Sequence, residues 1–435
     1  MKKVLCMAVA GLLVLAVQGK AYAGADLGSR LEVLEKQVSA LTGELAAARA
    51  ELDRVAREDA AVDASPAEDA GQPAAGVPGA VASAGERLSL GGYGEMHANF
   101  VEGGSGDVFD IHRLVLYLGY DFSDWIKLGS EIESEHAYVS TGSGGELNIE
   151  QLYVDFLLHD ALNVRVGRML APMGITNQRH EPPSFNGVER PSFDKVIIPT
   201  TWSVDGIGTY GNLTHNLRYQ VDVGAGLDGT KFSAKDGIRG GRIKERPSFN
   251  NVAVMGRADY FPLMDADVSV AQDLRLGGSF YHGGINNGNN GKDPGIDGSV
   301  TIFSADMEAT LKDVDVRGAA AYTVIDGAEK LPGVAEGIFG YYVEAGYHFW
   351  PESLKTGKLG RSDAVVFARY DDYDTQFRMP SGISGDPAGD RQEYTFGVNF
   401  YPVPNLVLKA DYQIRDSRGP AGLDNLINFG VGFQL

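Results

Sequence analysis

The last nine residues, Ile427-Asn428-Phe429-Gly430-Val431-Gly432-Phe433-Gln434-Leu435, alternate apolar and polar side chains up to the end of the chain. A period of two places the five apolar side chains on one face of a β-strand and the polar residues and glycines on the other. The first face is too apolar for water, and the second is too polar for a sealed core. A strand that meets lipid on one side and water on the other indicates an outer-membrane β-barrel.

The beginning of the chain predicts export. Lys2 and Lys3 precede an apolar run over 4–17, and Ala21-Tyr22-Ala23 offers a small-residue cleavage site. The run is too short for a spanning helix, so residues 1–23 are predicted to be a secretory signal peptide, with a membrane-anchored N-terminus as the alternative. The only cysteine, Cys6, lies inside this segment. The mature chain is therefore expected to have no disulfide, thiolate metal site or cysteine nucleophile.

Composition narrows the class of protein. The chain holds 57 glycines, 19 phenylalanines and 19 tyrosines, and no 18-residue apolar stretch follows the signal segment. Barrels distribute their apolar residues by alternation, so this pattern agrees with a β-barrel. The formal charge of −20 becomes −23 when Lys2, Lys3 and Lys20 are removed with the signal. Such acidity excludes nucleic acid as the main partner.

Residues 24–58 carry a heptad pattern, and residues 59–86 do not. The apolar a and d positions are Leu27, Leu31, Leu34, Val38, Leu41, Leu45, Ala48, Leu52 and Val55. Nine successive positions in register predict a coiled coil in the periplasm that joins copies of the chain, with an amphipathic helix on a neighbouring domain as the alternative. The oppositely charged pairs Arg30 with Glu35 and Glu44 with Arg49 favour a parallel arrangement. Leucine at both positions does not fix the number of strands. The alanine- and proline-rich residues 59–86 are expected to be a disordered linker.

Residues 87–435 are predicted to form an all-β transmembrane antiparallel barrel. Alternation recurs over 114–120, 152–158, 252–260, 274–280, 343–349, 394–400 and 406–414. Short turns at 121–124, 159–161 and 401–405 suit the periplasmic side, and long glycine-rich loops at 226–250, 283–298 and 374–391 suit the outside. At about 20–24 residues per strand with its loop, the 435 − 87 = 348 residues give roughly 14–18 strands, and sixteen is the best estimate. A barrel of that width is expected to hold an aqueous lumen and no packed interior.

The faces opposite the apolar residues carry charges that are expected to line the pore. The candidates for pore lining and ion selectivity are Arg113, Lys127, Glu131, Asp155, Arg165, Arg218, Arg257, Arg275, Arg317 and Arg369. Fixed charges in a lumen set the ion preference through the local field. The alternative is that arginines and carboxylates pair across strands and only hydrate the wall.

One loop reverses the acidic balance of the chain. Residues 231–246 hold six basic residues against Asp236 and Glu245, a local charge of +4. The basic loop is expected at the pore mouth, where it either collects anions, binds the phosphates of lipopolysaccharide or is merely solvated. Its basic residues are Lys231, Lys235, Arg239, Arg242, Lys244 and Arg246.

The stretch from Ala171 to Trp202 contains five prolines and shows no alternation. Loops of about thirty residues are functional or disordered, and apolar residues with rigid prolines favour order. We expect this constriction loop (residues 171–202) to fold into the lumen and narrow it. Its candidate functional residues are Arg179, His180, Glu181, Glu189, Arg190 and Lys195.

Three segments together resemble a known family. Gly92-Tyr93-Gly94-Glu95-Met96-His97, the segment from Glu150 to Phe156, and the run from Arg179 to Trp202 are similar to the phosphate-selective porin O/P-like family of Gram-negative outer membranes. The likeness covers most of residues 88–435 and is strongest over 165–205. It implies a trimeric sixteen-stranded barrel and passive uptake of anions such as phosphate.

Signals for an enzyme are weak. Residues 206–211 match a glycine spacing of dinucleotide-binding loops, but no βαβ unit surrounds them. The eight histidines show no metal-binding spacing, and no nucleophile elbow occurs. No cofactor and no metal are expected. The sequence therefore predicts a porin for small hydrophilic solutes, in contact with outer-membrane lipid and lipopolysaccharide. The alternative is a structural protein that links the outer membrane to the cell wall through its coiled coil.

Overall fold

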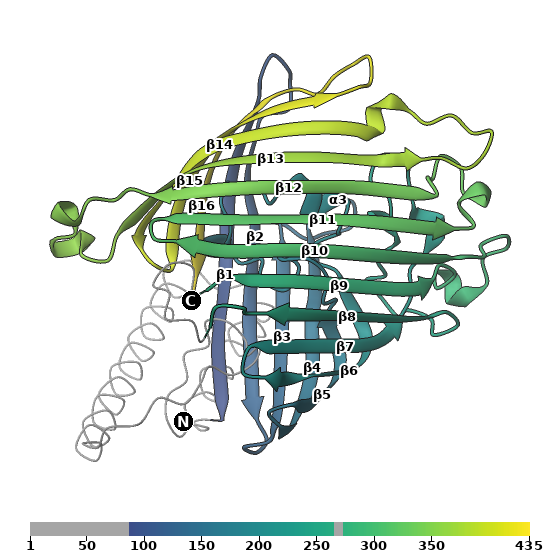
Figure 1. The fold of residues 1–435 in the computed structure, drawn as a ribbon, viewed down its shortest axis with the longest axis horizontal. Coiled ribbons are helices and arrows are strands. Elements are labelled where there is room, and N and C mark those ends of the chain that lie inside the picture. The colour runs from purple at the N-terminus through teal and green to yellow at the C-terminus, as the bar shows by residue number, and fades with distance from the viewer. Residues whose placement is uncertain (1–86, 265–272) are drawn as a thin grey trace, which may run out of the picture. The chain divides into compact units, whose positions relative to one another are not determined.

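The computed structural model describes residues 87–264 and 273–435. The predicted signal peptide (1–23), coiled coil (24–58) and linker (59–86) lie outside the described residues, so those three predictions stay untested. The described residues form a closed antiparallel barrel in which each strand pairs with its neighbours in sequence (Figure 1). Closure comes from β1 and β16, which pair from Tyr93 opposite Gln434 to Val101 opposite Leu426.

The barrel has sixteen strands, as predicted. They are β1 (Leu88–Val101), β2 (Val108–Asp121), β3 (Ile126–Glu135), β4 (Glu146–His159), β5 (Leu162–Leu170), β6 (Ser203–Thr214), β7 (Leu217–Ala225), β8 (Val252–Tyr260), β9 (Arg275–Gly284), β10 (Ser299–Leu311), β11 (Val314–Asp326), β12 (Gly337–His348), β13 (Asp363–Arg378), β14 (Asp390–Val403), β15 (Leu406–Ser417) and β16 (Leu426–Gln434).

Helices are few and short in the part of the chain that the structure describes. The α-helix of the described residues is α3 (Ser192–Val196), inside the constriction loop. The 3₁₀ turns are η1 (Pro182–Ser184), η2 (Gly229–Lys231), η3 (Arg239–Gly241), η4 (Asn289–Gly291), η5 (Ala328–Lys330), η6 (Glu352–Leu354), η7 (Gly357–Leu359) and η8 (Pro387–Gly389). Within 87–264 and 273–435, no helix has both the length and the apolar character needed to cross a bilayer.

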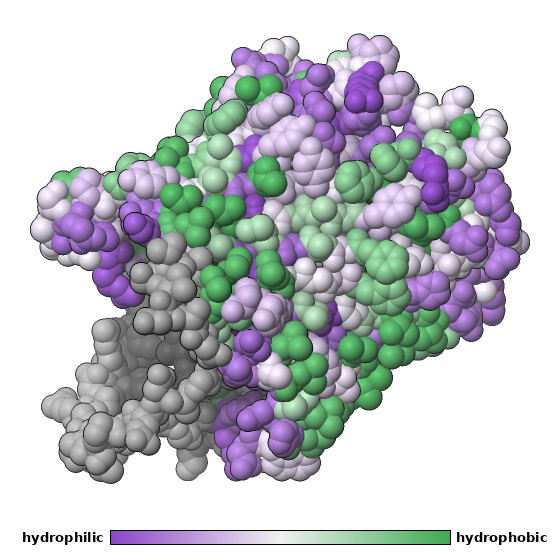
Figure 2. Space-filling view, viewed as in Figure 1, coloured by the Kyte–Doolittle hydropathy of each residue, from purple (hydrophilic) through white to green (hydrophobic). Residues whose placement is uncertain are grey.

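The two faces of the strands differ as the alternation predicts. On β2, Leu114, Leu116 and Leu118 are 36–51% exposed, while Val115 and Tyr117 are buried inside. On β16, Ile427 and Phe429 face outward and Asn428 is fully buried. Figure 2 shows apolar residues spread over the strand wall and hydrophilic residues gathered at the loops along its right edge. An apolar outer surface on a closed sheet is what a membrane-spanning barrel presents to lipid.

Short and long connections between strands alternate along most of the barrel, as predicted, but two segments differ from the prediction. Strand β13 continues to Arg378, so residues 374–378 of the predicted loop are strand, paired in part with β12 and β14. The connection 349–362 lies at the short-turn end, yet it is long and contains η6 and η7. The ends of the barrel are therefore distinguished by most of their connections and not by all of them.

The interior is not wholly aqueous, and the expectation of an unpacked lumen was wrong. A buried apolar cluster inside the barrel joins the constriction loop, the loops after β7, β9 and β11, and inward side chains of β8 to β13. Ala253, Val300, Ile302 and Tyr342 are among the wall residues in it, and all four are buried. These strands are apolar on both faces in this region, which is the pattern of strands that are covered on both sides. The loops bury their own apolar residues there and reduce the space left for water.

Candidate pore and constriction loop

The constriction loop begins at β5 and returns to β6 through a closed base. Asn177 Nδ2 donates to the carbonyl oxygens of Ala171 (2.8 Å) and Trp202 (3.1 Å), and Asn177 Oδ1 accepts from Trp202 N (2.9 Å). A further backbone hydrogen bond joins Ala171 N to Trp202 O (2.8 Å). A loop whose ends are joined and whose interior is packed by its own side chains is ordered.

From this base the loop crosses the lumen to the opposite wall. Strand β13 lies eight places from β5 in the ring of sixteen strands, which makes the two strands diametrically opposed. Asp371 of β13 accepts from Phe193 N of the loop (3.1 Å). On β15, two strands further round, Lys409 Nζ donates to the carbonyl oxygens of Phe185 (2.9 Å) and Gly187 (2.8 Å). Asp411 accepts from Val188 N (2.6 Å). The predicted position of residues 171–202 inside the barrel agrees with this arrangement.

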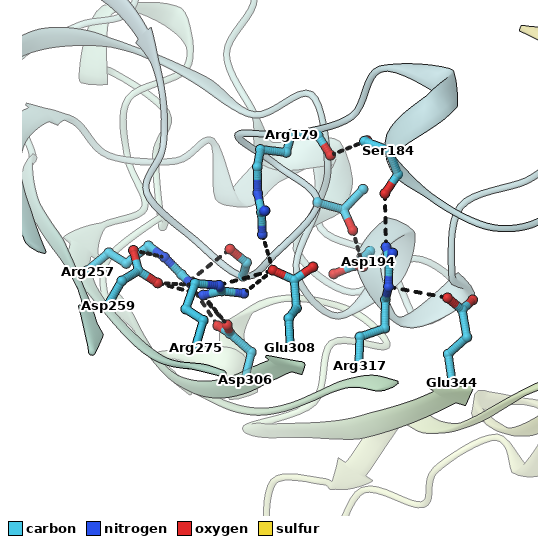
Figure 3. Close-up of polar contacts among 12 residues, drawn as sticks. Arg179, Ser184, Asp194, Arg257, Asp259, Arg275, Asp306, Glu308, Arg317 and Glu344 are labelled. Carbon is cyan, nitrogen blue, oxygen red and sulfur yellow. Dashed lines mark hydrogen bonds and ion pairs between the residues drawn. The ribbon is translucent and has the colours of Figure 1, made fainter. Parts of the chain in front are cut away.

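Two of the predicted pore-lining arginines also hold the loop backbone. Arg317 Nη1 donates to Ser184 O (3.0 Å), a contact seen in Figure 3, and Arg369 Nη1 donates to Asn186 O (3.2 Å). Both guanidinium groups pair with Glu344 as well. These arginines position the loop, and their charge is already compensated on the wall.

The candidate residues of the constriction loop lie in different surroundings. Arg179 is exposed in the lumen and pairs with Glu308 of β10, whereas Arg190 is buried beside the ring of Phe185. Glu181 accepts from the Tyr117 hydroxyl (3.2 Å). The remaining three are His180, which lies between Glu131 and Glu150, Glu189, which contacts His97, and Lys195, which pairs with Glu189.

Three ionisable groups of the loop have shifted pKa values. Burial raises the pKa of Asp194 on α3 to about 7, and the carboxyl group accepts a hydrogen bond from Thr176 Oγ1 (2.5 Å). Burial acts to raise the pKa of Glu189, but Lys195 and His97 lower it well below its usual value. Burial acts to lower the pKa of His180, and Glu150 and Glu131 raise it overall. The loop therefore contains one carboxyl group that titrates near neutrality.

The basic loop is partly engaged in packing. Arg239 Nη1 donates to Lys195 O (2.6 Å), and Arg242 donates to the carbonyl oxygens of Thr200 and Thr201. Burial and the adjacent Arg239 lower the pKa of Arg242 to about 10. The interpretation as a merely solvated loop is thus wrong for these two residues.

Five of the six basic residues of this loop, Arg239 and Arg242 included, border a cavity. Lys231 lies 3.5 Å from Asp228, and Lys244 pairs with Glu146. Lys231, Lys244 and Arg246 line a cavity of about 620 Å³ together with residues 287–290, at the long-loop end of the barrel. Lys235 lies in the segment between η2 and η3.

The wall arginines form a chain of ion pairs, visible in Figure 3. Arg257 and Arg275 both contact Asp306, at 2.8 Å each, and both contact Asp259. Arg275 Nη2 also lies 2.7 Å from Glu308, which binds Arg179 from the loop. These arginines therefore pair with carboxylates across strands, as in the alternative interpretation given above, and are not free charges.

Three of the remaining predicted wall residues are also ion-paired, and Arg218 and Glu131 make other contacts. Arg113 pairs with Glu95 (2.5 Å), Arg165 with Asp155 (2.7 Å) and Lys127 with Asp121 (2.9 Å). The guanidinium of Arg218 lies over the ring of Phe261, 4.9 Å from its centre. Glu131 accepts from Gln151 Nε2 (2.6 Å).

A cavity of about 420 Å³ lies between the constriction loop and the wall of β2 to β9. Its charged lining side chains are Arg165, Arg179, Arg218, Arg257, Arg275, Glu131 and Asp259, and its aromatic ones are Tyr117, Tyr153, Tyr210, Tyr219 and Phe261. Five guanidinium groups against two carboxylates make this lining basic, although the chain as a whole is acidic. Aromatic rings with a few charged groups are typical of a path that orients a small solute.

Sequence reasoning missed several residues that build this site. Lys409 and Asp411 alternate with the lipid-facing residues of β15, so parity alone placed them inside but gave no reason to expect a contact with residues 185–188. Glu150 was missed because it lies at a break in register. Glu131 pairs with Gln151 and Ile132 with Ile149, which leaves Glu150 unpaired. Two consecutive polar residues, Glu150 and Gln151, within an otherwise alternating strand were the available signal.

Comparisons with known proteins agree with this fold. The in-vitro folded trimer form of OmpT, an outer-membrane protein of Vibrio cholerae, shares 10% of residues with a TM-score of 0.50 over 80% of this chain and 99% of that one. Salmonella typhi OmpF, solved with daunomycin, shares 11% with a TM-score of 0.53 over 81% of this chain and 98% of that one. These likenesses show that the barrel has the fold of outer-membrane porins.

No protein-family model matches the sequence. An uncharacterized protein of Aquifex aeolicus (strain VF5) is 32% identical over 352 residues, which cover 76% of each chain. Identity at that level over three quarters of both chains shows common descent. The protein, a sixteen-stranded barrel of the porin fold, therefore belongs to the same family as this Aquifex aeolicus protein.

Proposed function

We propose that the protein is an outer-membrane porin that lets small hydrophilic solutes diffuse passively through its barrel. The observation that carries this proposal is the charged cavity of about 420 Å³ that remains beside a loop crossing the lumen. A closed barrel with an apolar outer wall supports a location in the outer membrane. Because the buried apolar cluster occupies part of the interior, we propose a narrow path and a conductance below that of an empty sixteen-stranded barrel.

We further propose a preference for anions. The basic lining of the cavity creates a positive local field, and fields of this kind set ion preference in pores. Asp155, Asp306 and Glu308 pair with the lining arginines from behind and, with Glu131 and Asp259, equal them in number. The proposed field therefore depends on the guanidinium groups lining the cavity while these three carboxylates do not. We therefore expect a moderate preference for anions in general, with phosphate as one of them. The basic loop at the mouth is proposed to attract the same solutes or the phosphates of lipopolysaccharide.

We propose that three copies associate through residues 24–58. The heptad over those residues supports an oligomer. The trimer form of the Vibrio cholerae OmpT structure supports three copies as the number. The predicted periplasmic position of this segment follows from its place before the first strand.

Conductance in planar lipid bilayers tests the proposal. Full-length protein should give discrete channels, and the reversal potential in a KCl gradient should have the sign of chloride preference. Millimolar phosphate should carry or reduce the current. Cation preference would contradict the anion proposal while leaving the pore. Insertion without current would contradict the porin and favour a structural link to the cell wall.

A further inference from the structure

The contact between the constriction loop and the β3–β4 wall contains a buried cluster of three ligand-type side chains. Glu131 comes from β3, Glu150 from β4 and His180 from the loop, and their exposed fractions are 2%, 0% and 2%. One nitrogen or oxygen atom from each lies within 4.8 Å of the other two. Side chains this deeply buried are ordinarily compensated by hydrogen bonds.

Four atoms of the cluster lack a hydrogen-bond partner among the described residues. They are His180 Nε2, Glu131 Oε1 and both carboxylate oxygens of Glu150. His180 Nε2 lies 3.4 Å from Glu150 Oε2 and 3.7 Å from Glu131 Oε1. In a tetrahedral site with bonds of about 2.1 Å, ligand atoms are about 3.4 Å apart. The spacing therefore suits a shared cation at least as well as direct contact.

Neighbouring polar groups hydrogen-bond to His180 and Glu131 and orient them, as the groups around metal ligands commonly do. His180 Nδ1 lies 2.9 Å from the carbonyl oxygen of Asn177, which favours the tautomer with the proton on Nδ1 and leaves the lone pair on Nε2 facing the carboxylates. Gln151 Nε2 donates to Glu131 Oε2 (2.6 Å) and leaves Oε1 for the cluster. Asn177 is itself fixed by the closed base of the loop.

The backbone of β4 directs Glu150 into this site. The register break beside Glu131 and Ile132 is a β-bulge, which allows Glu150 and Gln151 to face the interior in succession. Bulges commonly redirect a side chain beside a functional site. Without the bulge, Glu150 would share the outward face with its neighbours in the strand, where a carboxylate would meet lipid.

We propose that Glu131, Glu150 and His180 bind one divalent transition-metal cation of the Zn²⁺, Mn²⁺ or Fe²⁺ class. Two carboxylates and one imidazole are the ligands such ions take, and the two negative charges balance a dication. A proton on His180 balances only one of them and leaves carboxylate oxygens of Glu150 without a donor. The cation enters from the lumen, because Glu131 and Gln151 also line the cavity of about 420 Å³. Bound there, it fastens the constriction loop to the β3–β4 wall, in addition to the anchoring by Lys409 on β15.

Metal titration of the purified full-length protein in detergent tests this. After treatment with EDTA and its removal, Mn²⁺ binding is followed by electron paramagnetic resonance and Zn²⁺ binding by competition with a chromogenic chelator. The wild type should bind one ion per chain at this site. Glu150→Gln, which keeps the shape of the side chain, and His180→Gln should each weaken binding at least tenfold.

His136→Gln is the matched control. It alters the half-exposed group of Asp110, His112 and His136, whose ligand-type atoms already contact one another, and it should leave the ion of the buried site bound. The folded band on unheated gels verifies that each variant forms a barrel. The proposal is overturned if the wild type binds neither ion, or if folded Glu150→Gln binds as tightly as wild type. Should neither cluster variant fold, pulsed resonance of Mn²⁺-loaded His136→Gln decides, since absence of a histidine ¹⁴N coupling would refute the site.

Discussion

The side-chain Nη1 of Arg239 donates a 2.6 Å hydrogen bond to the carbonyl oxygen of Lys195, so that the basic loop holds the constriction loop. Arg242 makes the equivalent contact with Thr200 at the end of the same segment. Hydrogen bonds from charged donors to buried carbonyl groups contribute about 1.5–3 kcal/mol each. The two arginines therefore act on the pore through the position of the loop as well as through their charge.

Replacing Arg239 and Arg242 by alanine should remove the hydrogen bonds that hold residues 195–201 in place. We expect noisier single-channel currents and a loss of about 2–4 kcal/mol in the free energy of unfolding by urea. Lys231→Ala is the control, because it removes a charge from the same loop without a contact to the constriction loop. Equal current noise in the control and the double variant would show that charge alone matters.

Arg179→Gln should change selectivity with little effect on stability. The Arg179 side chain is 51% exposed and lines the cavity, and its partner Glu308 keeps Arg275. Loss of one positive charge should move the reversal potential toward cations, while the free energy of unfolding stays within about 0.5 kcal/mol of wild type. Lys358→Gln, on the exposed η7 turn, is the control with the same change of charge. A shift of the same size in both variants would place the effect outside the cavity.

Asp194→Asn should alter how stability depends on pH. The pKa of about 7 in the folded protein exceeds the usual value of 3.8, so the folded state binds more protons between those values. The contribution of Asp194 therefore becomes unfavourable as pH rises from about 4 to 7, and it stays unfavourable above 7. The asparagine variant should match wild type near pH 4 and be about 1–3 kcal/mol more stable at pH 8, measured by urea unfolding. An unchanged difference across this range would refute the assignment.

Gly432→Ala should disturb the packing of the constriction loop against β16. A Cβ atom at this position would lie 2.2 Å from Cβ of Pro182, which is too close for contact. We expect a loss on the order of 1–3 kcal/mol and altered conductance. Gly278→Ala is the matched control on β9, where the nearest atom would be 3.8 Å away. Equal stability of the two variants would indicate that the loop moves aside without cost.

Deleting residues 24–60 should weaken the oligomer and preserve the pore. The heptad leucines of that segment are proposed to hold the subunits together, and the barrel closes within a single chain. Native gels and light scattering should show fewer trimers, and single-channel conductance should remain at the wild-type level. Unchanged oligomers would show that the barrel wall carries the association.

The sequence predicted the features that depend on local alternation. The period of two in residues 427–435 indicated the barrel, and the proline-rich run over 171–202 indicated an ordered insertion. The alternation also placed Arg257, Arg275 and Arg369 inside. Each of these predictions needs only the geometry of one strand or loop.

Features that join distant segments were not predictable in the same way. The contact of Lys409 with Phe185 joins residues 224 positions apart, and no periodicity relates them. The bulge at Glu150 reverses the parity on which the inward assignments depend. The apolar cluster requires that several loops fold over β8 to β13, which no single loop sequence specifies. Long-range packing and one register change therefore decide where the space in the lumen remains.

The barrel wall holds residues 184–189 mainly through hydrogen bonds to their main-chain atoms. Arg317, Lys409 and Arg369 donate to carbonyl oxygens, and Asp411 accepts from an amide. Such contacts are largely indifferent to which amino acids the segment contains. In a channel built this way, substitutions at exposed loop positions such as 179 can change which solute passes. The hydrogen bonds that anchor the constriction loop to the wall stay the same, because they do not depend on the substituted side chains.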